Sequence, residues 1–516
     1  MPMNESMDTK DDKKIDMVSD NHDDLFSRTF LSGIGILMAR GISVLIELLK
    51  TFFFAFLLSP EDFGIVGGAL LIINTINLFS ESQIEAALIQ KKGDIKSYLD
   101  SAWSFKIVKS IVVASSLSLL SPLIASGFQE SRMVLVIIIL SIMAIFRDMT
   151  NIGIVHYSKD LRYKKIFIYR TLIPLFSFFL VILLSLIIQN YWIMVFSYGA
   201  VYISEFILSF LLHPYRPRFK LDREKLKEIL GYSKWIYLSS LFTFFNVELD
   251  DFLVGVFFGI EMLGFYQLAY RLSCLPATQI TFVVSEITFS SYSIVQEHPE
   301  KLRKGFTKTF QIVCFIAIPF NFFILFFCRD LIIIFLQPDW EPLISLVQIL
   351  SMWGLIRAIN GNRGALTNAI GKPSIDAKIK GISTIILYSL LIPLGYLFGV
   401  HGIAMSILIT SIIASIIGFR ILLKLIRCKV KELVPFLFIP LLNSLITIFI
   451  LSFLKTFFLQ ETSMINLILL IAISAIMYIS LCVITERLSK FEFISLIKEL
   501  LSTILPKKGN DGSLDI

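Results

Sequence analysis

Three carboxylates stand within four positions of a long apolar stretch, in the segment NVELDDFLVG at residues 246–255. A charged side chain near the bilayer centre costs about 2.5–3.5 kcal/mol on insertion scales, so such residues mark ion or substrate pathways. At about 1.5 Å per residue, Asp250 and Arg271 lie at similar depths on the two helices that flank the turn near residue 259. Their shared depth predicts an ion pair, which either serves transport or clamps the two helices together.

Other ionisable residues also fall inside apolar runs. Arg40 and Glu47 are seven residues apart and share a helical face, while Lys50 follows Glu47 by three positions and is placed to pair with it. Arg147 and Arg357 lie at matching depths in their helices. A carboxylate such as Asp250 or Glu47 is a candidate to exchange a proton or Na⁺ during transport.

The elements that position these residues are membrane helices. The chain has 516 residues, of which 56% are hydrophobic and 17% charged, with a mean hydropathy of +0.78. Apolar runs long enough to cross a bilayer recur throughout, so the fold class is an all-α polytopic membrane protein. Hydropathy predicts about fourteen transmembrane helices, near 29–58, 62–90, 100–127, 132–157, 164–188, 191–213, 232–258, 262–290, 303–328, 341–368, 376–398, 401–425, 433–454 and 464–485.

Basic residues alternate between the connecting loops. The loops near 91–96, 159–165, 216–227, 301–304, 372–380 and 427–431 each hold several Lys or Arg, whereas SPED, QNYW, FFGIEM and FGVHG hold none. The positive-inside rule therefore places the basic loops and both termini in the cytoplasm. This distribution also accounts for the net charge of +7 without nucleic-acid binding.

An internal repeat divides the chain. Glu61 and Gly64 align with Glu261 and Gly264, and Arg147 aligns with Arg357 further along. Two six-helix units in the same orientation predict a parallel repeat, as in alternating-access transporters. The expected parts are a disordered cytoplasmic tail (1–27), an N-terminal lobe (28–213), a cytoplasmic amphipathic linker (214–231), a C-terminal lobe (232–426), two further helices (433–486) and a cytoplasmic amphipathic tail (487–516).

Signatures of metal and nucleotide chemistry are missing. The five cysteines lie in or beside apolar runs without CxxC spacing and are expected to be small core residues, and the histidines form no HExxH motif. GKPS at 371–374 lacks the upstream glycine of a P-loop. We therefore expect no metal and no cofactor, and a gradient or the membrane potential as the energy source.

Several segments resemble the Wzx-like polysaccharide flippases, the polysaccharide transport family of the multidrug/oligosaccharidyl-lipid/polysaccharide exporter superfamily. They are LSPEDFGIVGGALLIINTINLFSESQIEAALIQKK, HPYRPRFKLD, LDDFLVGVFFGIEMLGFYQLAYRLSCLP and GALTNAIGKP. The resemblance implies a MATE/MurJ-like fold, with two six-helix bundles around a central cavity plus two C-terminal helices. It also implies flipping of a polyprenyl-pyrophosphate-linked oligosaccharide, such as an O-antigen, capsule or exopolysaccharide repeat unit, across the bacterial inner membrane. Polysaccharide assembly proteins are further expected partners.

This substrate suggests roles for the buried charges. Guanidinium groups bind phosphate oxygens in a bidentate manner, so Arg40, Arg147, Arg271 and Arg357 are expected to line the cavity and hold the pyrophosphate. Nearby aromatic residues are candidates to stack on sugars: Trp235, Tyr237, Tyr266, Tyr270 and Trp353. The family pattern has a single acid, at Asp250, so we expect Glu248 and Asp251 to face water in the outer vestibule.

Three alternatives remain open from the residues. A drug/cation antiporter of the same superfamily would have a twelve-helix core, which does not account for the last two helices. A membrane glycosyltransferase or polysaccharide polymerase would need a sizeable domain outside the membrane, and the longest outer loop spans only about 328–341. A non-transporting scaffold would explain neither the repeat nor the buried arginines. We therefore expect a transporter and no enzyme.

Overall fold

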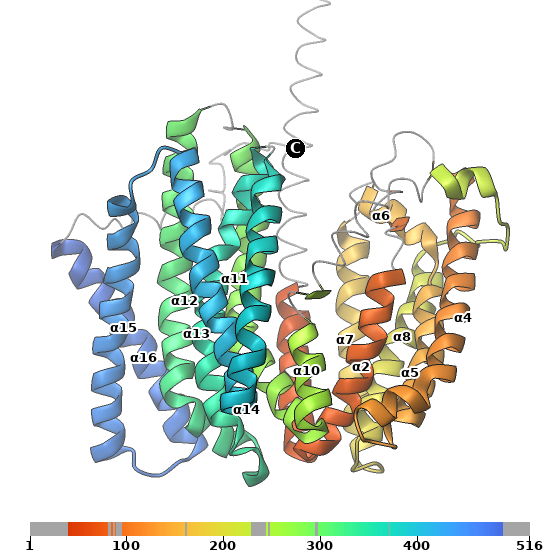
Figure 1. Ribbon diagram of the computed structural model, residues 1–516, viewed down its shortest axis with the longest axis horizontal. Coiled ribbons are helices and arrows are strands. Elements are labelled where there is room, and N and C mark those ends of the chain that lie inside the picture. The colour runs from red at the N-terminus through yellow and green to blue at the C-terminus, as the bar shows by residue number, and fades with distance from the viewer. Residues whose placement is uncertain are drawn as a thin grey trace, which may run out of the picture. The chain divides into compact units, whose positions relative to one another are not determined.

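The protein is all-helical in the residues that its computed structural model describes, which are 40–80, 84–85, 88, 95–159, 163–228, 244–245, 248–294, 298–370 and 372–488 (Figure 1). Residues 40–57 are helical. The helices that follow are α2 (Pro60–Ser80), α4 (Lys96–Gly127), α5 (Met133–Asp148), η1 (Ile152–Ile154), α6 (Val155–Lys159), α7 (Tyr163–Ser185), α8 (Trp192–Leu212), α10 (Leu249–Phe258), α11 (Ile260–Ile294), α12 (Pro299–Phe335), η2 (Pro338–Trp340), α13 (Leu343–Ala369), α14 (Pro373–Leu425), α15 (Val430–Phe458) and α16 (Met464–Leu488).

The polytopic membrane class is confirmed. Within the described residues, nine helices are long and apolar enough to cross a membrane. Large apolar side chains remain exposed along them, as at Leu119, Ile187 and Phe449, and lipid solvates such side chains at no cost. All five cysteines are buried and form no disulfide bond, as expected for core residues. The total of about fourteen helices remains a prediction.

One long helix is in fact a hairpin. A straight α14 would place Asp376 and Ser415 about 58 Å apart. Both contact α13, however, where Arg363 bonds to Asp376 and Asn360, one turn away, bonds to Ser415. The chain therefore turns back at Gly399, whose φ of 62° and ψ of −143° are not helical. The two arms correspond to the spans expected at 376–398 and 401–425.

The span expected at 132–157 ends earlier than predicted, because α5 stops at Asp148. Asn151 breaks the helix through its side chain. Its Oδ1 accepts from Gly153 N at 2.9 Å, and its Nδ2 donates to Tyr215 O at 2.6 Å. A side chain that satisfies backbone groups in this way competes with the helical hydrogen bonds.

The linker after α8 is fixed along α4 by a series of hydrogen bonds. Asp100 accepts from the Tyr215 hydroxyl at 2.6 Å and from Arg218 N at 2.9 Å, and Ser104 Oγ accepts from Lys220 N at 2.8 Å. Burial and the Asp100 carboxylate raise the pKa of Tyr215, so it remains a donor at neutral pH. Residues 223–228, within the amphipathic linker expected at 214–231, are helical.

The last two helices pack on α12. The Tyr478 hydroxyl of α16 donates to Phe315 O at 2.9 Å, with the two rings 5.2 Å apart. Near the end of α15, Lys455 Nζ lies 2.7 Å from Asp330 Oδ1. Asn443 of α15 donates to Thr485 of α16 at 3.2 Å. Polar contacts of this kind hold helices together in lipid, where no hydrophobic effect does so.

The described residues group into two compact units. One contains residues up to 51, 80–119 and 138–237, and the other contains 52–79, 120–137 and those from 238 onward. The lobe limits expected at 28–213 and 232–426 remain a prediction, as do the tail at 1–27 and most of 487–516, which lie outside the described residues.

Candidate functional site

The acids of α10 face the first turns of α11. Asp250 is buried, and its Oδ2 accepts from the Tyr266 hydroxyl at 2.8 Å. Asp251 Oδ2 accepts from Gln267 Nε2 at 3.3 Å, while its Oδ1 is buried without a hydrogen-bond partner among the described residues. The expectation that Asp251 faces water was therefore wrong. The physical reason is that α11 packs against this face of α10 and takes the place of the expected vestibule water.

Arg357 of α13 contacts α11 at Tyr270, one turn beyond Tyr266. Its Nη1 donates to the Tyr270 hydroxyl at 2.7 Å, and its guanidinium carbon lies 5.3 Å from the centre of the Trp353 ring. The rings of Tyr270 and Trp353 are themselves 5.0 Å apart. Two of the aromatic residues expected near the substrate thus surround an arginine that was expected to bind it.

A glycine makes this contact geometrically possible. A Cβ on Gly354 would lie 2.4 Å from the carbonyl oxygen of Ser273, so only glycine lets α13 approach α11 this closely. Arg357 is one turn beyond Gly354, and Tyr270 is one turn before Ser273. The close backbone approach therefore brings Arg357 onto the Tyr270 face of α11.

The partners of Arg357 are chemically important because they are neutral. Among the described residues, no carboxylate lies within ion-pair distance of its guanidinium. The hydroxyl of Tyr270, the indole of Trp353 and the thiol of Cys274, whose Sγ lies 4.0 Å from Arg357 Nη1, position the guanidinium without neutralising it. Arg357 therefore keeps its positive charge within the described part of the fold, and Tyr266 and Tyr270, four residues apart on α11, lie between it and Asp250.

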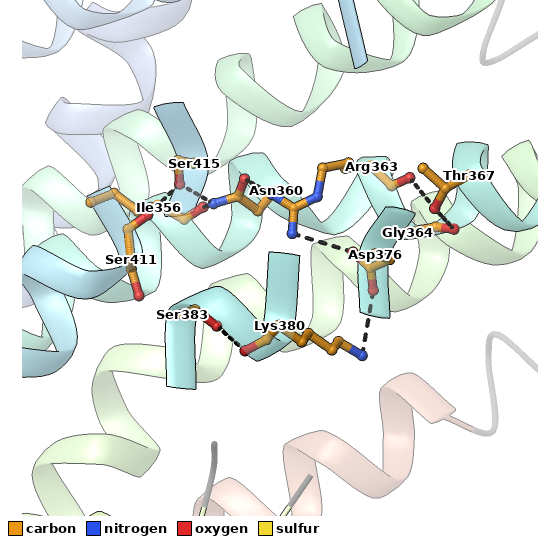
Figure 2. Close-up of polar contacts among 10 residues, drawn as sticks. All are labelled: Ile356, Asn360, Arg363, Gly364, Thr367, Asp376, Lys380, Ser383, Ser411 and Ser415. Carbon is orange, nitrogen blue, oxygen red and sulfur yellow. Dashed lines mark hydrogen bonds and ion pairs between the residues drawn. The ribbon is translucent and has the colours of Figure 1, made fainter. Parts of the chain in front are cut away.

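Arg363 provides a contrast on the same helix (Figure 2). Its Nη2 donates to Asp376 Oδ1 at 3.3 Å, and its Nη1 donates to Asn360 Oδ1 at 3.2 Å. Lys380 Nζ lies 3.4 Å from the other oxygen of Asp376. Because Asn360 also bonds to Ser415, the network joins α13 to both arms of α14. Arg363 is thus neutralised and fastens helices together.

In the other unit, Glu47 pairs with Lys50 at 3.0 Å, as predicted. Lys50 is almost fully buried and also donates to Ser177 Oγ at 3.2 Å, whereas the Glu47 side chain is half exposed. Arg40 is exposed. Arg147 lies 5.4 Å from the centre of the Tyr202 ring. Arg40 and Glu47 therefore belong to the helix at 40–57, which contacts α7 through Lys50, whereas Arg147 of α5 contacts α8.

Two lysines of α4 were missed by the sequence analysis. Lys106 Nζ lies 2.7 Å from Glu85 Oε1, and Lys109 Nζ lies 3.3 Å from Asp148 Oδ2, next to Arg147. Their spacing of three in an apolar helix, FKIVK, was a usable signal. They were overlooked because they stand near the expected cytoplasmic end, where lysines are ordinary.

The remaining predicted site residues are placed as follows. Arg271 of α11 lies over the ring of Phe63, 5.8 Å from its centre. Trp235 and Tyr237 lie outside the described residues. Arg40, Glu47 and Arg147 belong to one unit, whereas Asp250, Arg271 and Arg357 belong to the other. Their joint role in one cavity remains a prediction.

Comparison with known proteins identifies the family. The family model described as "Polysaccharide biosynthesis protein" matches residues 53–345, more than half of the chain. The chain belongs to this family. Lipopolysaccharide biosynthesis protein WzxC of Escherichia coli (strain K12) is 21% identical over 399 residues, which cover 76% of this chain and 80% of WzxC. An uncharacterized membrane protein in the cps region of Klebsiella pneumoniae is 24% identical over 452 residues, 86% of this chain and 92% of that protein.

The fold has a counterpart among solved structures. The lipid II flippase MurJ in an inward closed conformation superposes with a TM-score of 0.70 and 17% identity, covering 89% of this chain and 99% of MurJ. At this identity the likeness shows the fold alone. The expected MATE/MurJ-like fold is thereby confirmed for this member of the polysaccharide biosynthesis family.

Proposed function

We propose that the protein is a flippase that moves a polyprenyl-pyrophosphate-linked oligosaccharide across the bacterial inner membrane by alternating access. The family membership and the fold shared with a lipid II flippase support this proposal. The single observation that carries it is Arg357, a guanidinium inside an apolar helix that is held by neutral aromatic and thiol partners. A pyrophosphate is a ligand that such a group would bind.

In this mechanism Arg357 would bind a phosphate oxygen, while Trp353 and Tyr270 would stack on the first sugar. Arg40, Arg147 and Arg271 would contribute further positive charge. The prenyl chain would remain in lipid. The substrate is drawn from the cytoplasmic leaflet and released on the outer side, where assembly proteins would receive it.

A deletion strain tests this function. Without the protein, lipid-linked oligosaccharide should accumulate in the inner leaflet and surface polysaccharide should be lost. The measurement is the accessibility of the oligosaccharide to an impermeant lectin added outside spheroplasts. Unchanged accessibility together with intact surface polysaccharide would refute the proposal, and a change in drug sensitivity alone would favour the antiporter.

Coupling to a proton or Na⁺ is assigned to Asp250. Replacement Asp250→Asn should lower export while leaving the amount of protein unchanged, because the Tyr266 hydroxyl can still donate to the amide oxygen. Export is measured as polysaccharide per folded protein. If the amount of protein falls in parallel with export, Asp250 acts as a static clamp between helices instead.

A further inference from the structure

The first turns of α2 and α11 contact each other reciprocally. α2 begins at Pro60 and α11 at Ile260. A Cβ on Gly64 would lie 1.9 Å from Ile260 O, and a Cβ on Gly264 would lie 2.0 Å from Pro60 O. Each glycine therefore contacts the first residue of the other helix. The contact is self-complementary, as at a two-fold axis, and it joins residues that the internal repeat makes equivalent.

Gln267 extends this contact one turn deeper. Its Nε2 donates to Gly67 O at 3.4 Å, and its Oε1 lies 1.9 Å from where a Cβ of residue 67 would be. The same amide nitrogen lies 3.3 Å from Asp251 Oδ2. Gln267 thus joins three helices, α2, α11 and α10. We call residues 60–67 and 260–267 the α2–α11 seam.

Two pairs of aromatic rings repeat the symmetry beside the seam. Phe52 and Phe335 have ring centres 5.1 Å apart, and Phe252 and Phe128 have ring centres 5.7 Å apart. Phe52 and Phe252 are equivalent in the repeat, and Phe335 and Phe128 both stand at the end of a long helix, α12 and α4. The seam and both ring pairs therefore belong to one two-fold arrangement at the ends of helices that are expected to face outward.

The seam is suited to open and close. Its centre is a backbone-to-backbone contact between glycines, which has no interlocking side chains to withdraw when the helices part. The hydrogen bond that Gln267 Nε2 donates across the two helices to Gly67 O is 3.4 Å long and correspondingly weak. Separation would bring water to Gln267 and to Asp251 Oδ1, which has no hydrogen-bond partner among the described residues. The charged groups of Asp250, Glu248 and Arg271 lie near Asp251.

We propose that the α2–α11 seam is the outer gate, and that Gln267 is the positioning residue that ties gate closure to the Asp251 carboxylate. When the seam is closed, Gln267 holds Asp251 away from external water and cations. When the seam parts, the hydrogen bond from Gln267 to Gly67 O breaks, and Asp251 becomes accessible from outside. This inference rests on the proposed function, because a gate has meaning only in a transporter.

A buried reporter tests the gate. Ala269 is fully buried on α11, so Ala269→Cys, in a chain whose five cysteines are replaced, should react slowly with an impermeant maleimide added outside. Gly64→Ala and Gly264→Ala hold the seam open and should raise the labelling rate several-fold. Gly127→Ala is the matched control, because a Cβ there meets nothing within 4 Å. Equal labelling rates in the seam and control variants, per folded protein, would overturn the proposal.

A reversible lock provides a second measurement that does not depend on mutant folding. Phe52→Cys with Phe335→Cys, and separately Phe252→Cys with Phe128→Cys, are joined by a short reducible bifunctional thiol reagent. Export should stop when the pair is linked and return on reduction. Export that continues through the linked protein would show that these helices need not part. If the parent protein exports nothing, the proposed function fails, while the labelling result still decides whether the seam opens.

The role of Gln267 needs a separate readout. Gln267→Leu removes both hydrogen bonds and should raise labelling of the reporter and change the dependence of export on external Na⁺ or pH. Gln267→Asn retains the amide and should restore part of the parent behaviour. A Gln267→Leu protein that is only less abundant, with parent labelling and ion dependence, would assign Gln267 a structural role and refute the coupling.

Discussion

Two arginines two turns apart on α13 differ in what surrounds them. Arg357 contacts tyrosine, tryptophan and cysteine, whereas Arg363 contacts Asp376. No carboxylate among the described residues neutralises the first, which suits the ligand proposed for it, whereas the second is neutralised within the fold. Sequence alone ranked Arg357 as a site residue through its position in the repeat, but the identity of its partners is a property of the packed helices.

This difference leads to a prediction for Arg357→Gln and its matched control, Arg363→Gln. The first should lower export about tenfold or more, since a hydrogen bond to a charged group contributes about 1.5–3 kcal/mol, with stability unchanged. The second should lower the free energy of unfolding by about 1–3 kcal/mol, because Asp376 loses a partly buried ion-pair partner. Both are measured as export per folded protein and as thermal midpoint in detergent. The opposite pattern would reverse the two roles.

At the scale of an element, the reversal within α14 depends on Gly399. Its φ of 62° with ψ of −143° lies in a region that residues with a Cβ rarely adopt. The sequence placed an outer turn in FGVHG because both flanks are apolar, but it did not reveal how tight the turn is. In the structure only one residue breaks the helical geometry.

Gly399→Ala should therefore lower the free energy of unfolding by about 1–3 kcal/mol through backbone strain. Gly395→Ala is the control on the same arm, since its Cβ would make an ordinary contact with Ile403 at 3.5 Å. Unfolding is followed by thermal denaturation in detergent. Equal midpoints for the two variants would contradict the strain argument.

At the scale of the whole molecule, orientation follows from charge. The basic linker near Lys220 is expected in the cytoplasm and the turn near Gln189 outside, and both side chains are exposed. In a chain without native cysteines, Gln189→Cys should react with an impermeant maleimide in intact cells, whereas Lys220→Cys should react only after the membrane is permeabilised. The reverse result would invert the topology and, with it, the assignment of the α2–α11 seam to the outer side.

The sequence alone determined what depends on local composition and spacing. Apolar length identified the membrane helices, the spacing of Glu47 and Lys50 predicted their ion pair, and the alignment of Gly64 with Gly264 predicted the repeat. Hydropathy and helical periodicity depend on residues that are close in the sequence, so the sequence of a single chain is sufficient to determine them.

Tertiary structure decided which polar groups meet. The sequence predicted that Asp251 faces water, but α11 packs over it and Gln267 donates a hydrogen bond to its carboxylate. The α2–α11 contact and the neutral surroundings of Arg357 depend on close approach at Gly64, Gly264 and Gly354 between helices far apart in the chain. The sequence does not show which neighbouring backbone packs against a given glycine, because that depends on how the helices cross.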